Sequence, residues 1–487
     1  MPGPDFPALG TDVDVDVAVI GAGIVGVVTA ALLKEAGMSV ALLDSRRVLE
    51  GCTGYTTAKL TSSHGVIYSH LTRSFGVEGA RTYGEANEAA LRWVAERVER
   101  DGIDCGFERH PNFVYTEDPD EVATLQEEAA KAREAGLPAS FTTDTDLPFP
   151  VLGAVRFENQ AQFHPRGFLF PLVSSLSGDG SHVFANTAAT AFKEDGRCSV
   201  TTEQGTIHCN DVVIATHLPV FDRGLFFAKA HPYASYCVSG ELDEGRNFEG
   251  MYISTGGDAT RSIRTIPHEG GRRLLVGGNS HKIGLDKPTS KHYLSLQEFG
   301  RRWWDVGDFP ERWSAHDYVS VDKVPFVGRF TRASDHTYVA TGFGKWGMTN
   351  GVAAAMMISD QIQGRRNKWA PFFDAKRVNL SQVKESITEN AQVAQRFVVD
   401  RIPDLTSADD LEPGQGKVVS SGLGKVALYK GEDGNVHKLS ARCTHLGCIV
   451  HWNDGDRSWD CPCHGSRFSA EGKVMNGPAI DDLKELD

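Results

Sequence analysis

Residues 14–26 read DVDVAVIGAGIVG, and this stretch decides the fold of most of the chain. Its first seven residues alternate Asp with Val and then turn fully apolar, which predicts a strand whose second half is buried. Gly21, Gly23 and Gly26 follow at the spacing G-x-G-x-x-G and lead into a predicted helix over residues 24–36. A strand, a tight turn and a helix in this order predict a dinucleotide-binding α/β unit.

Each of the three glycines meets a separate need of such a unit. Gly21 permits the turn, Gly23 lets a diphosphate approach the backbone, and Gly26 lets the helix pack closely on the strand. The N-terminus of the helix attracts the diphosphate. A second predicted strand, residues 39–43, ends in Asp44, which is placed to accept hydrogen bonds from a ribose. These signals indicate a dinucleotide without choosing between FAD and NAD.

The next segment, residues 50–60, reads EGCTGYTTAKL. Its glycines and threonines suit a backbone that lies against a cofactor, and they make Thr53, Thr56 and Thr57 candidate cofactor contacts. The alternative is a polar loop with a helix N-cap. Arg46 and Arg47, beside Asp44, fit a solvated basic pair better than a site for the NADP phosphate.

This segment resembles the flavin-contacting segment of the D-amino-acid oxidase, glycine oxidase and sarcosine oxidase family. The resemblance extends over about residues 14–375 and implies FAD as the cofactor. Some relatives attach FAD covalently through a histidine here, where this chain has Tyr55, so the resemblance does not extend to that linkage.

The middle of the chain predicts a substrate domain. Apolar stripes predict helices at residues 84–102 and 119–136. Predicted strands at residues 234–241, 251–253, 272–277 and 313–321 form a mixed or antiparallel sheet beside the active site. Arg261 and Arg264 precede one of these strands, and the resemblance implies that an arginine near Arg264 pairs with a substrate carboxylate. A planar guanidinium suits that role, and an ordinary surface arginine is the equal alternative.

Residues 339–351 read VATGFGKWGMTNG, an apolar strand entering a glycine-rich loop before a helix at residues 352–362. The N-terminus of that helix would direct partial positive charge at a flavin carbonyl. Lys345 is a catalytic candidate at the flavin face, with solvation as its alternative. The candidate FAD contacts of this loop are Gly342, Gly344, Trp346, Gly347, Met348 and Thr349.

A second kind of site lies near the end of the chain, where residues 443–466 begin CTHLGC and end CPCHGS. Cys443, His445, Cys461 and His464 form the pattern C-x-H…C-x-x-H. Two thiolates and two imidazoles in this order suit a Rieske [2Fe–2S] centre, in which the thiolates hold one iron and the imidazoles the other. Zinc is the alternative, but zinc fingers usually pair Cys-x-x-Cys with His-x-x-x-His, whereas each half here mixes the two.

The same residues resemble the Rieske family almost letter for letter. The resemblance to the bc-complex type implies a disulfide between Cys448 and Cys463 that ties the two ligand loops together. It also implies that Ser466 hydrogen-bonds a cluster sulfide. Phe468 stands where some high-potential members have tyrosine, which argues against a very high potential.

The composition limits the class of protein. With 487 residues, 40% of them hydrophobic and 23% charged, the chain is long enough for two or three soluble domains. A net charge of −14 argues against a nucleic-acid partner. Residues 1–16 lack the basic region of a signal peptide, and no apolar run reaches the length of a membrane span. Five of the nine cysteines are scattered singly, which predicts a cytoplasmic protein.

These signals predict an α/β FAD-binding Rossmann-like domain with an interleaved mixed-sheet substrate domain, plus a small all-β Rieske domain. The FAD-binding domain is expected at residues 1–80, 155–217 and 326–375, and the substrate domain at 81–154 and 218–325. A polar helix and a linker are expected at 376–416, and the Rieske domain at 417–487.

The expected function is that of an FAD-dependent oxidoreductase, a dehydrogenase or an oxidase, that oxidises a C–N bond of an amine or amino acid. Electrons would pass between the flavin and the Rieske cluster, with an external carrier or O2 as partner. The alternative is a flavin and Rieske electron-transfer module that serves a partner enzyme; it would be favoured by a second NAD fingerprint, which the sequence lacks.

Overall fold

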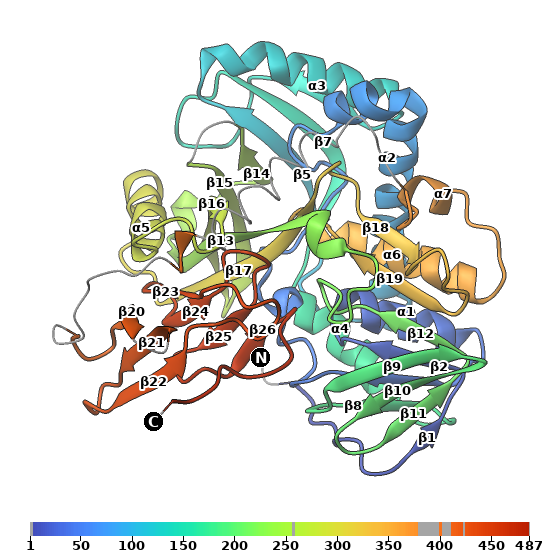
Figure 1. Ribbon diagram of the computed structural model, residues 1–487. Coiled ribbons are helices and arrows are strands. Elements are labelled where there is room, and N and C mark those ends of the chain that lie inside the picture. Colours follow the sequence, from blue (N-terminus) through green and yellow to red (C-terminus); the bar gives the residue numbers. More distant parts are fainter. Residues whose placement is uncertain (1–2, 256–258, 378–398, 402–410, 422–423, 487) are drawn as a thin grey trace.

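A computed structural model describes residues 3–255, 259–377, 399–401, 411–421 and 424–486 of the chain (Figure 1). The polar helix and linker expected at residues 376–416 lie largely outside the described residues. The described part forms two large sheets, a smaller one packed beside them, and a separate β domain at the C-terminal end.

A six-stranded sheet in the order β18-β19-β12-β2-β3-β8 carries the dinucleotide fingerprint. All of its pairings are parallel except β18 with β19. Every residue of β2, β3 and β12 is buried, because helices cover a parallel sheet and make its strands apolar throughout. The strands are β2 Val17–Ile20, β3 Val40–Leu43, β8 His182–Phe184, β12 Asp211–Ile214, β18 Phe326–Arg329 and β19 Thr337–Thr341.

Three helices pack on this sheet or beside it: α1 Ile24–Glu35, α4 Pro165–Ser174 and α6 Gly347–Ile362. Helices α1 and α6 cross closely, since a Cβ added at Gly351 would lie 2.9 Å from Ile24 Cγ2. The small side chains of α6 allow this approach and place its N-terminus near that of α1. The smaller sheet has the order β1-β11-β10-β9, with β1 Val13–Asp14, β9 Ala189–Asp195, β10 Arg197–Thr202 and β11 Thr206–Cys209.

A mixed nine-stranded sheet has the order β17-β13-β16-β15-β14-β5-β7-β4, with β6 paired to β7. Strands β5 and β14 are parallel, whereas the pairings of β13 with β16 and β17 are antiparallel. The strands are β4 Lys59–Leu60, β5 Glu108–Thr116, β6 Ala139–Thr142, β7 Gly153–Gln162, β13 Ala230–Leu242, β14 Met251–Ser254, β15 Arg261–His268, β16 Gly271–Lys282 and β17 Glu311–Ser320.

Two details of this sheet differ from expectation. Strands β4 and β7 belong to it although they fall within ranges expected for the FAD-binding domain, because the chain crosses between the two large sheets. Arg261 and Arg264 lie within β15, whereas the sequence placed them before a strand. The side chain of Arg264 therefore points from the sheet into the protein, where it is 5% exposed.

The helices α2 Tyr68–Asp101, α3 Val122–Glu134, α5 Ser290–Trp304 and α7 Ala370–Phe373 complete this region. Helix α2 starts well before the predicted residue 84, and a non-helical Gly76 interrupts it. Its N-terminus is capped from α3, because the Glu128 carboxylate accepts the backbone N–H groups of Ile67, Tyr68 and Ser69 at 2.7–2.8 Å. A cap supplied by a distant residue leaves no local signal for the start of a helix.

The C-terminal domain is all β, with antiparallel sheets β20-β21-β22 and β23-β24-β25-β26. Trp459 is fully buried in its core and donates to the carbonyl of Ala470 at 3.1 Å. In Figure 1 this domain, drawn in red, lies beside β17 and α5. The strands are β20 Gly416–Ser421, β21 Gly424–Lys430, β22 Val436–Ser440, β23 His451–Asn453, β24 Ser458–Asp460, β25 Arg467–Ser469 and β26 Val474–Asn476.

The predicted fold class is confirmed: an α/β dinucleotide-binding fold with an interleaved mixed sheet and a small all-β domain. No helix formed by the described residues is both long enough and apolar enough to cross a membrane.

Candidate cofactor sites

A cavity of about 400 Å³ opens where β2 ends and α1 begins. It reaches the second glycine loop at α6 and the C-terminal domain. Among the predicted cofactor contacts, those that line it are Gly21, Gly23, Asp44, Thr53, Thr56, Gly347 and Met348, together with Lys345.

The fingerprint glycines of this cavity are required by close packing. Gly21 has a φ of +103°, and a Cβ there would lie 2.5 Å from the carbonyl oxygen of Ala215. A Cβ at Gly26 would lie 1.9 Å from the carbonyl oxygen of Gly21. Side chains at either position would therefore fill the turn that brings backbone N–H groups to a bound diphosphate. The cavity fits a dinucleotide.

Asp44 sits at the end of β3, on the cavity wall. Its two carboxylate oxygens accept the backbone N–H groups of Ala22 at 2.9 Å and Arg46 at 3.0 Å. Burial raises the pKa of Asp44, and these two hydrogen bonds oppose that effect. The carboxylate is thus fixed beside the glycine turn, where a ribose hydroxyl would donate to it.

The threonines of residues 50–60 divide between the cavity and the protein interior. Thr53 Oγ1 accepts the N–H of Ile24 at 3.0 Å and so caps α1 from a short 3-10 helix, Cys52–Tyr55. Thr56 also lines the cavity. Thr57 does not, and instead packs against Gly277 of β16, where an added Cβ would lie 3.3 Å from its Cγ2.

The second glycine loop turns sharply between β19 and α6. Gly342 and Gly344 have φ values of +76° and +59°, so they shape the loop without lining the cavity. Trp346 and Thr349 also lie behind the cavity wall, and both contact His64, a residue that the sequence did not single out.

His64 packs against the second glycine loop and forms a hydrogen bond to it. Its ring stacks on Trp346 with centroids 4.8 Å apart, and its nitrogens contact Tyr83 Oη at 2.6 Å and Thr349 Oγ1 at 3.0 Å. Burial lowers the pKa of His64 to about 3, so the ring is neutral at physiological pH. His64 therefore fixes the start of α6, which lies at the cavity.

Lys345 reaches the cavity from a strained backbone, with a φ of +74°. Its ammonium donates to the Ser280 hydroxyl and lies 5.5 Å from the Tyr233 ring centroid. Lys345 lines the cavity and is an exposed residue. The protein atoms around its ammonium nevertheless lower the pKa of Lys345 to about 8 by desolvation, and nearby Asp317 partly opposes the shift.

Arg264 lies outside the cavity wall. It donates to Gln162 Oε1 at 3.1 Å, and its Nε has no hydrogen-bond partner among the described residues. Burial lowers its pKa to about 10. Lys59 is a second buried cation beside it, donating to the carbonyl of Tyr252 at 2.9 Å, and burial lowers the pKa of Lys59 to about 7.

The four candidate cluster ligands meet at the tip of the C-terminal domain. The Cys443 and Cys461 side chains are 3% and 1% exposed. Their thiols hydrogen-bond to each other, which lowers the pKa of Cys443 to about 7 and raises that of Cys461. The two thiols therefore lie side by side, as required of two thiolates that bind the same iron.

The two histidines face the same point. The rings of His445 and His464 lie perpendicular with centroids 5.0 Å apart. The Nδ1 atoms of both are buried without a hydrogen-bond partner among the described residues, as expected of nitrogens that bind a metal. Burial lowers both pKa values, to about 3 for His464, which keeps the imidazoles neutral and able to bind a metal. These residues fit a [2Fe–2S] cluster.

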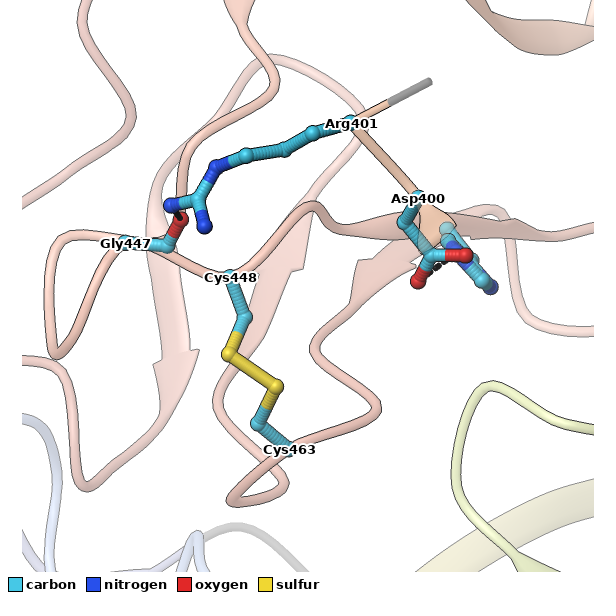
Figure 2. The surroundings of a disulfide bond; sticks show 6 residues. Asp400, Arg401, Gly447, Cys448 and Cys463 are labelled. Atoms are coloured by element: carbon cyan, nitrogen blue, oxygen red, sulfur yellow. Dashed lines mark hydrogen bonds and ion pairs between the residues drawn. A yellow bond between two sulfur atoms is a disulfide. The ribbon is translucent and has the colours of Figure 1, made fainter. Parts of the chain in front are cut away.

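Cys448 and Cys463 are joined by a disulfide with a Cα–Cα distance of 6.4 Å, which ties the two ligand loops together (Figure 2). The sulfurs of Cys448, Cys461 and Cys463 lie within 4.8 Å of one another. Two of these sulfurs are already bonded to each other, so this group is not a metal site. Figure 2 also shows Arg401 donating to the carbonyl of Gly447, at 2.8 Å.

The wall between the two sites was not predicted from the sequence. Tyr318 of β17 is 2% exposed, lines the cavity, and donates to the carbonyl of ligand His464 at 2.9 Å. His316, two residues earlier, also lines the cavity, and neither ring nitrogen has a partner among the described residues. The sequence offered no signal here, because these contacts join residues 146 positions apart.

Comparison with known proteins now identifies the parts of the chain. The family model described as FAD dependent oxidoreductase matches residues 16–361. The chain belongs to this family. The model of the Rieske [2Fe-2S] domain matches residues 402–487.

Two relatives match the chain over different lengths. The YhfW protein of Bacillus subtilis (strain 168), whose name provisionally assigns it to the Rieske 2Fe-2S iron-sulfur proteins, is 35% identical across 99% of this chain and 96% of its own. The gamma-glutamylputrescine oxidoreductase of Escherichia coli (strain K12) is 25% identical across 75% of this chain and 88% of its own.

Solved structures match the flavoprotein part. Glycine oxidase from Geobacillus kaustophilus has a TM-score of 0.62 at 17% identity, covering 75% of this chain and 99% of its own. An L-amino acid deaminase from Proteus vulgaris has a TM-score of 0.62 at 17% identity, covering 78% and 97%. At this identity the likeness shows a common fold.

The protein is therefore an FAD-dependent oxidoreductase with a C-terminal Rieske domain, and both predicted cofactors, FAD and a [2Fe–2S] cluster, are confirmed. The roles of individual residues stay predictions, which the geometry above makes specific.

Proposed function

We propose that this enzyme oxidises a C–N bond of an amine or amino acid and that electrons pass between its FAD and its Rieske cluster. Support for the reaction comes from the relatives, whose names describe oxidation or deamination of gamma-glutamylputrescine, glycine and L-amino acids. Support for the electron transfer comes from the position of one residue.

That residue is Tyr318, which belongs to both sites. Its ring lines the flavin cavity, and its hydroxyl donates to the carbonyl of His464 at 2.9 Å and to that of Gly477 at 3.3 Å. Phe227 packs edge-on against His464, with ring centroids 5.0 Å apart. The histidine side of the cluster site thus faces the flavoprotein body, which makes this side the natural route for electrons.

Different residues would bind the two cofactors and stabilise charge during the reaction. FAD, when bound, supplies the acceptor for a hydride from the carbon next to nitrogen. The glycine turn and the N-terminus of α1 hold its diphosphate, and Asp44 holds its ribose. Lys345 stands with its ammonium in the cavity, where a cation would stabilise negative charge that develops during reduction. Cys443 and Cys461 would bind one iron of the cluster, and His445 with His464 the other.

Arg264 is our candidate for the substrate carboxylate. Among the described residues, the buried guanidinium donates to an amide oxygen, not to a carboxylate, and its Nε has no hydrogen-bond partner, so pairing with an anion would be favourable. Because Arg264 lies behind the cavity wall, this role requires that the substrate space extend toward β15.

An external electron carrier or O2 completes the proposal. The cluster favours a dehydrogenase that delivers electrons to a carrier over a simple oxidase. The five single cysteines outside the Rieske domain are all unpaired, which supports a cytoplasmic location.

Anaerobic stopped-flow spectroscopy with a panel of amines and amino acids tests this function. We expect at least one of these compounds to bleach the flavin, followed by reduction of the cluster. Flavin that responds only to NADH or NADPH would contradict the proposal and favour an electron-transfer module for a partner enzyme.

A further inference from the structure

The cavity that fits FAD has a wall that the flavoprotein family does not provide. The family match ends at residue 361, yet the Rieske domain contributes a substantial part of the lining. We call residues 474–482 the roof loop; they comprise β26 and the segment after it. The cavity-lining residues of the Rieske domain are Gly465, Val474, Met475, Asn476, Gly477, Ala479, Ile480 and Asp482.

The roof loop is tied to both ligand loops of the cluster. Thr444, between two candidate ligands, donates through its hydroxyl to the carbonyl of Asp481 at 2.6 Å. Ser466 Oγ accepts the N–H of Ala479 at 3.0 Å. The position of the roof loop over the cavity therefore depends on the fold of the cluster-binding tip.

The Rieske domain is also held in place from the other side, at α5. The Asp454 carboxylate accepts the backbone N–H groups of Thr289 at 2.7 Å and Ser290 at 3.3 Å, and the Thr289 hydroxyl at 2.9 Å. Helix α5 has no side-chain cap of its own at Thr289, so the Rieske domain supplies it.

A second carboxylate strengthens this contact. Asp456 accepts the Tyr293 hydroxyl at 2.5 Å and the Ser314 hydroxyl at 2.6 Å. Arg467 of the Rieske domain also donates to Ser314, at 3.0 Å. These directional bonds specify one docked position of the domain, the position in which the roof loop faces the glycine turn.

We propose that the roof loop of the Rieske domain is part of the FAD-binding site, so that FAD leaves the protein only when this domain moves away from the flavoprotein body. FAD then has to enter before the domain docks. The proposal holds whichever way electrons flow, since it concerns binding alone.

The test is the rate at which FAD leaves the full-length protein, followed without substrate by the rise in free-flavin fluorescence after dilution. In the Asp454→Ala variant the charge-assisted bonds that dock the domain are lost, and we expect release to be about tenfold faster. The matched control is Asp433→Ala: Asp433 lies in the same domain and caps only its own turn, accepting the N–H of Asn435 at 3.0 Å. It should release FAD like the wild type.

A second variant, Asn476→Ala, changes the roof loop itself and leaves the docking contacts intact. Faster release here as well would place the loop in the binding site. Wild-type release rates in both variants would overturn the proposal, while the substrate and electron-transfer experiments would be unaffected. Because the Asn476 side chain makes none of the docking hydrogen bonds described above, this variant remains informative if Asp454→Ala fails to fold.

Discussion

Lys345 has two energetically unfavourable features, a strained backbone and a partly desolvated ammonium. Its backbone lies in the left-handed region, which costs a non-glycine residue roughly 1–2 kcal/mol, and its ammonium is partly desolvated by the protein atoms around it. Strain of this kind tends to gather at functional sites. The lowered pKa, about 8, means that the ammonium loses its proton as the pH rises through that value.

We therefore predict that flavin reduction by substrate slows as the pH rises through about 8, because the cation that stabilises developing negative charge is lost. Lys345→Met should lower the rate of flavin reduction roughly a hundredfold at pH 7 and remove the fall in this rate near pH 8. Lys345→Arg keeps the positive charge at all these pH values, so it should retain most of the rate and also lack the fall near pH 8. The measurement is anaerobic flavin reduction across pH; an unchanged profile in the Met variant would contradict the role.

Each cluster ligand should be individually necessary for iron binding. His445→Ala removes one of two buried imidazoles whose Nδ1 atoms lack partners, so iron binding at that side should fail. We expect loss of the Rieske electron paramagnetic resonance signal and of bound iron. His437→Ala, which changes a histidine on β22 of the same domain, should retain both. Zinc in place of iron in the purified wild-type protein would refute the cluster assignment.

At the scale of elements, α2 depends on a cap from another helix. The Glu128 carboxylate accepts three backbone N–H groups and the Ser69 hydroxyl, whereas a glutamine would turn an N–H donor toward some of them. We predict that Glu128→Gln lowers the free energy of unfolding by about 1–3 kcal/mol in chemical denaturation. Glu127→Gln, at the exposed neighbouring position, should change it little. Equal stability of the two variants would disprove the cap.

Some helices and strands could be predicted from the sequence, and others could not. Strand β2, helix α1 and Asp44 were predictable, because the glycine spacing, the apolar strands and the acidic residue form a pattern within about 30 residues of sequence. Helix α5 was missed: its cap, Asp454, is 165 residues from Thr289. The start of α2 was missed because Glu128 is about 60 residues away. In both cases the stabilising partner is absent from the local sequence.

The residues of the candidate sites also fall into two groups, those with a local sequence pattern and those without one. Four cluster ligands within 22 residues carry their own pattern of types and spacing, so they could be named from sequence. The glycines and Asp44 also carry a local pattern. Tyr318 and His316 carry none. In the roof loop, residues 477–479 resemble the proline-containing loop that covers a Rieske cluster, but nothing local links the loop to the flavin cavity, because only the docking of two domains brings it there. Trp346 and Thr349 were predicted to contact FAD because they belong to the glycine-rich loop. In the structure both contact His64 instead of lining the cavity.

At the scale of the whole molecule, directional hydrogen bonds dock the Rieske domain on the flavoprotein body. Asp454, Asp456 and Tyr318 all contribute to this interface. Because the two cofactor sites share a wall, we propose that electrons pass between flavin and cluster within one chain, without an encounter between molecules.

The most direct test reduces the flavin with a light pulse and a sacrificial donor under anaerobic conditions, so that no substrate need be known. The redistribution of electrons between flavin and cluster is then followed by absorbance at two protein concentrations that differ about tenfold. We predict a first-order rate that is the same at both concentrations, as expected for transfer within one chain. A rate that rises in proportion to protein concentration, or a cluster whose redox state never responds to the flavin, would contradict the account.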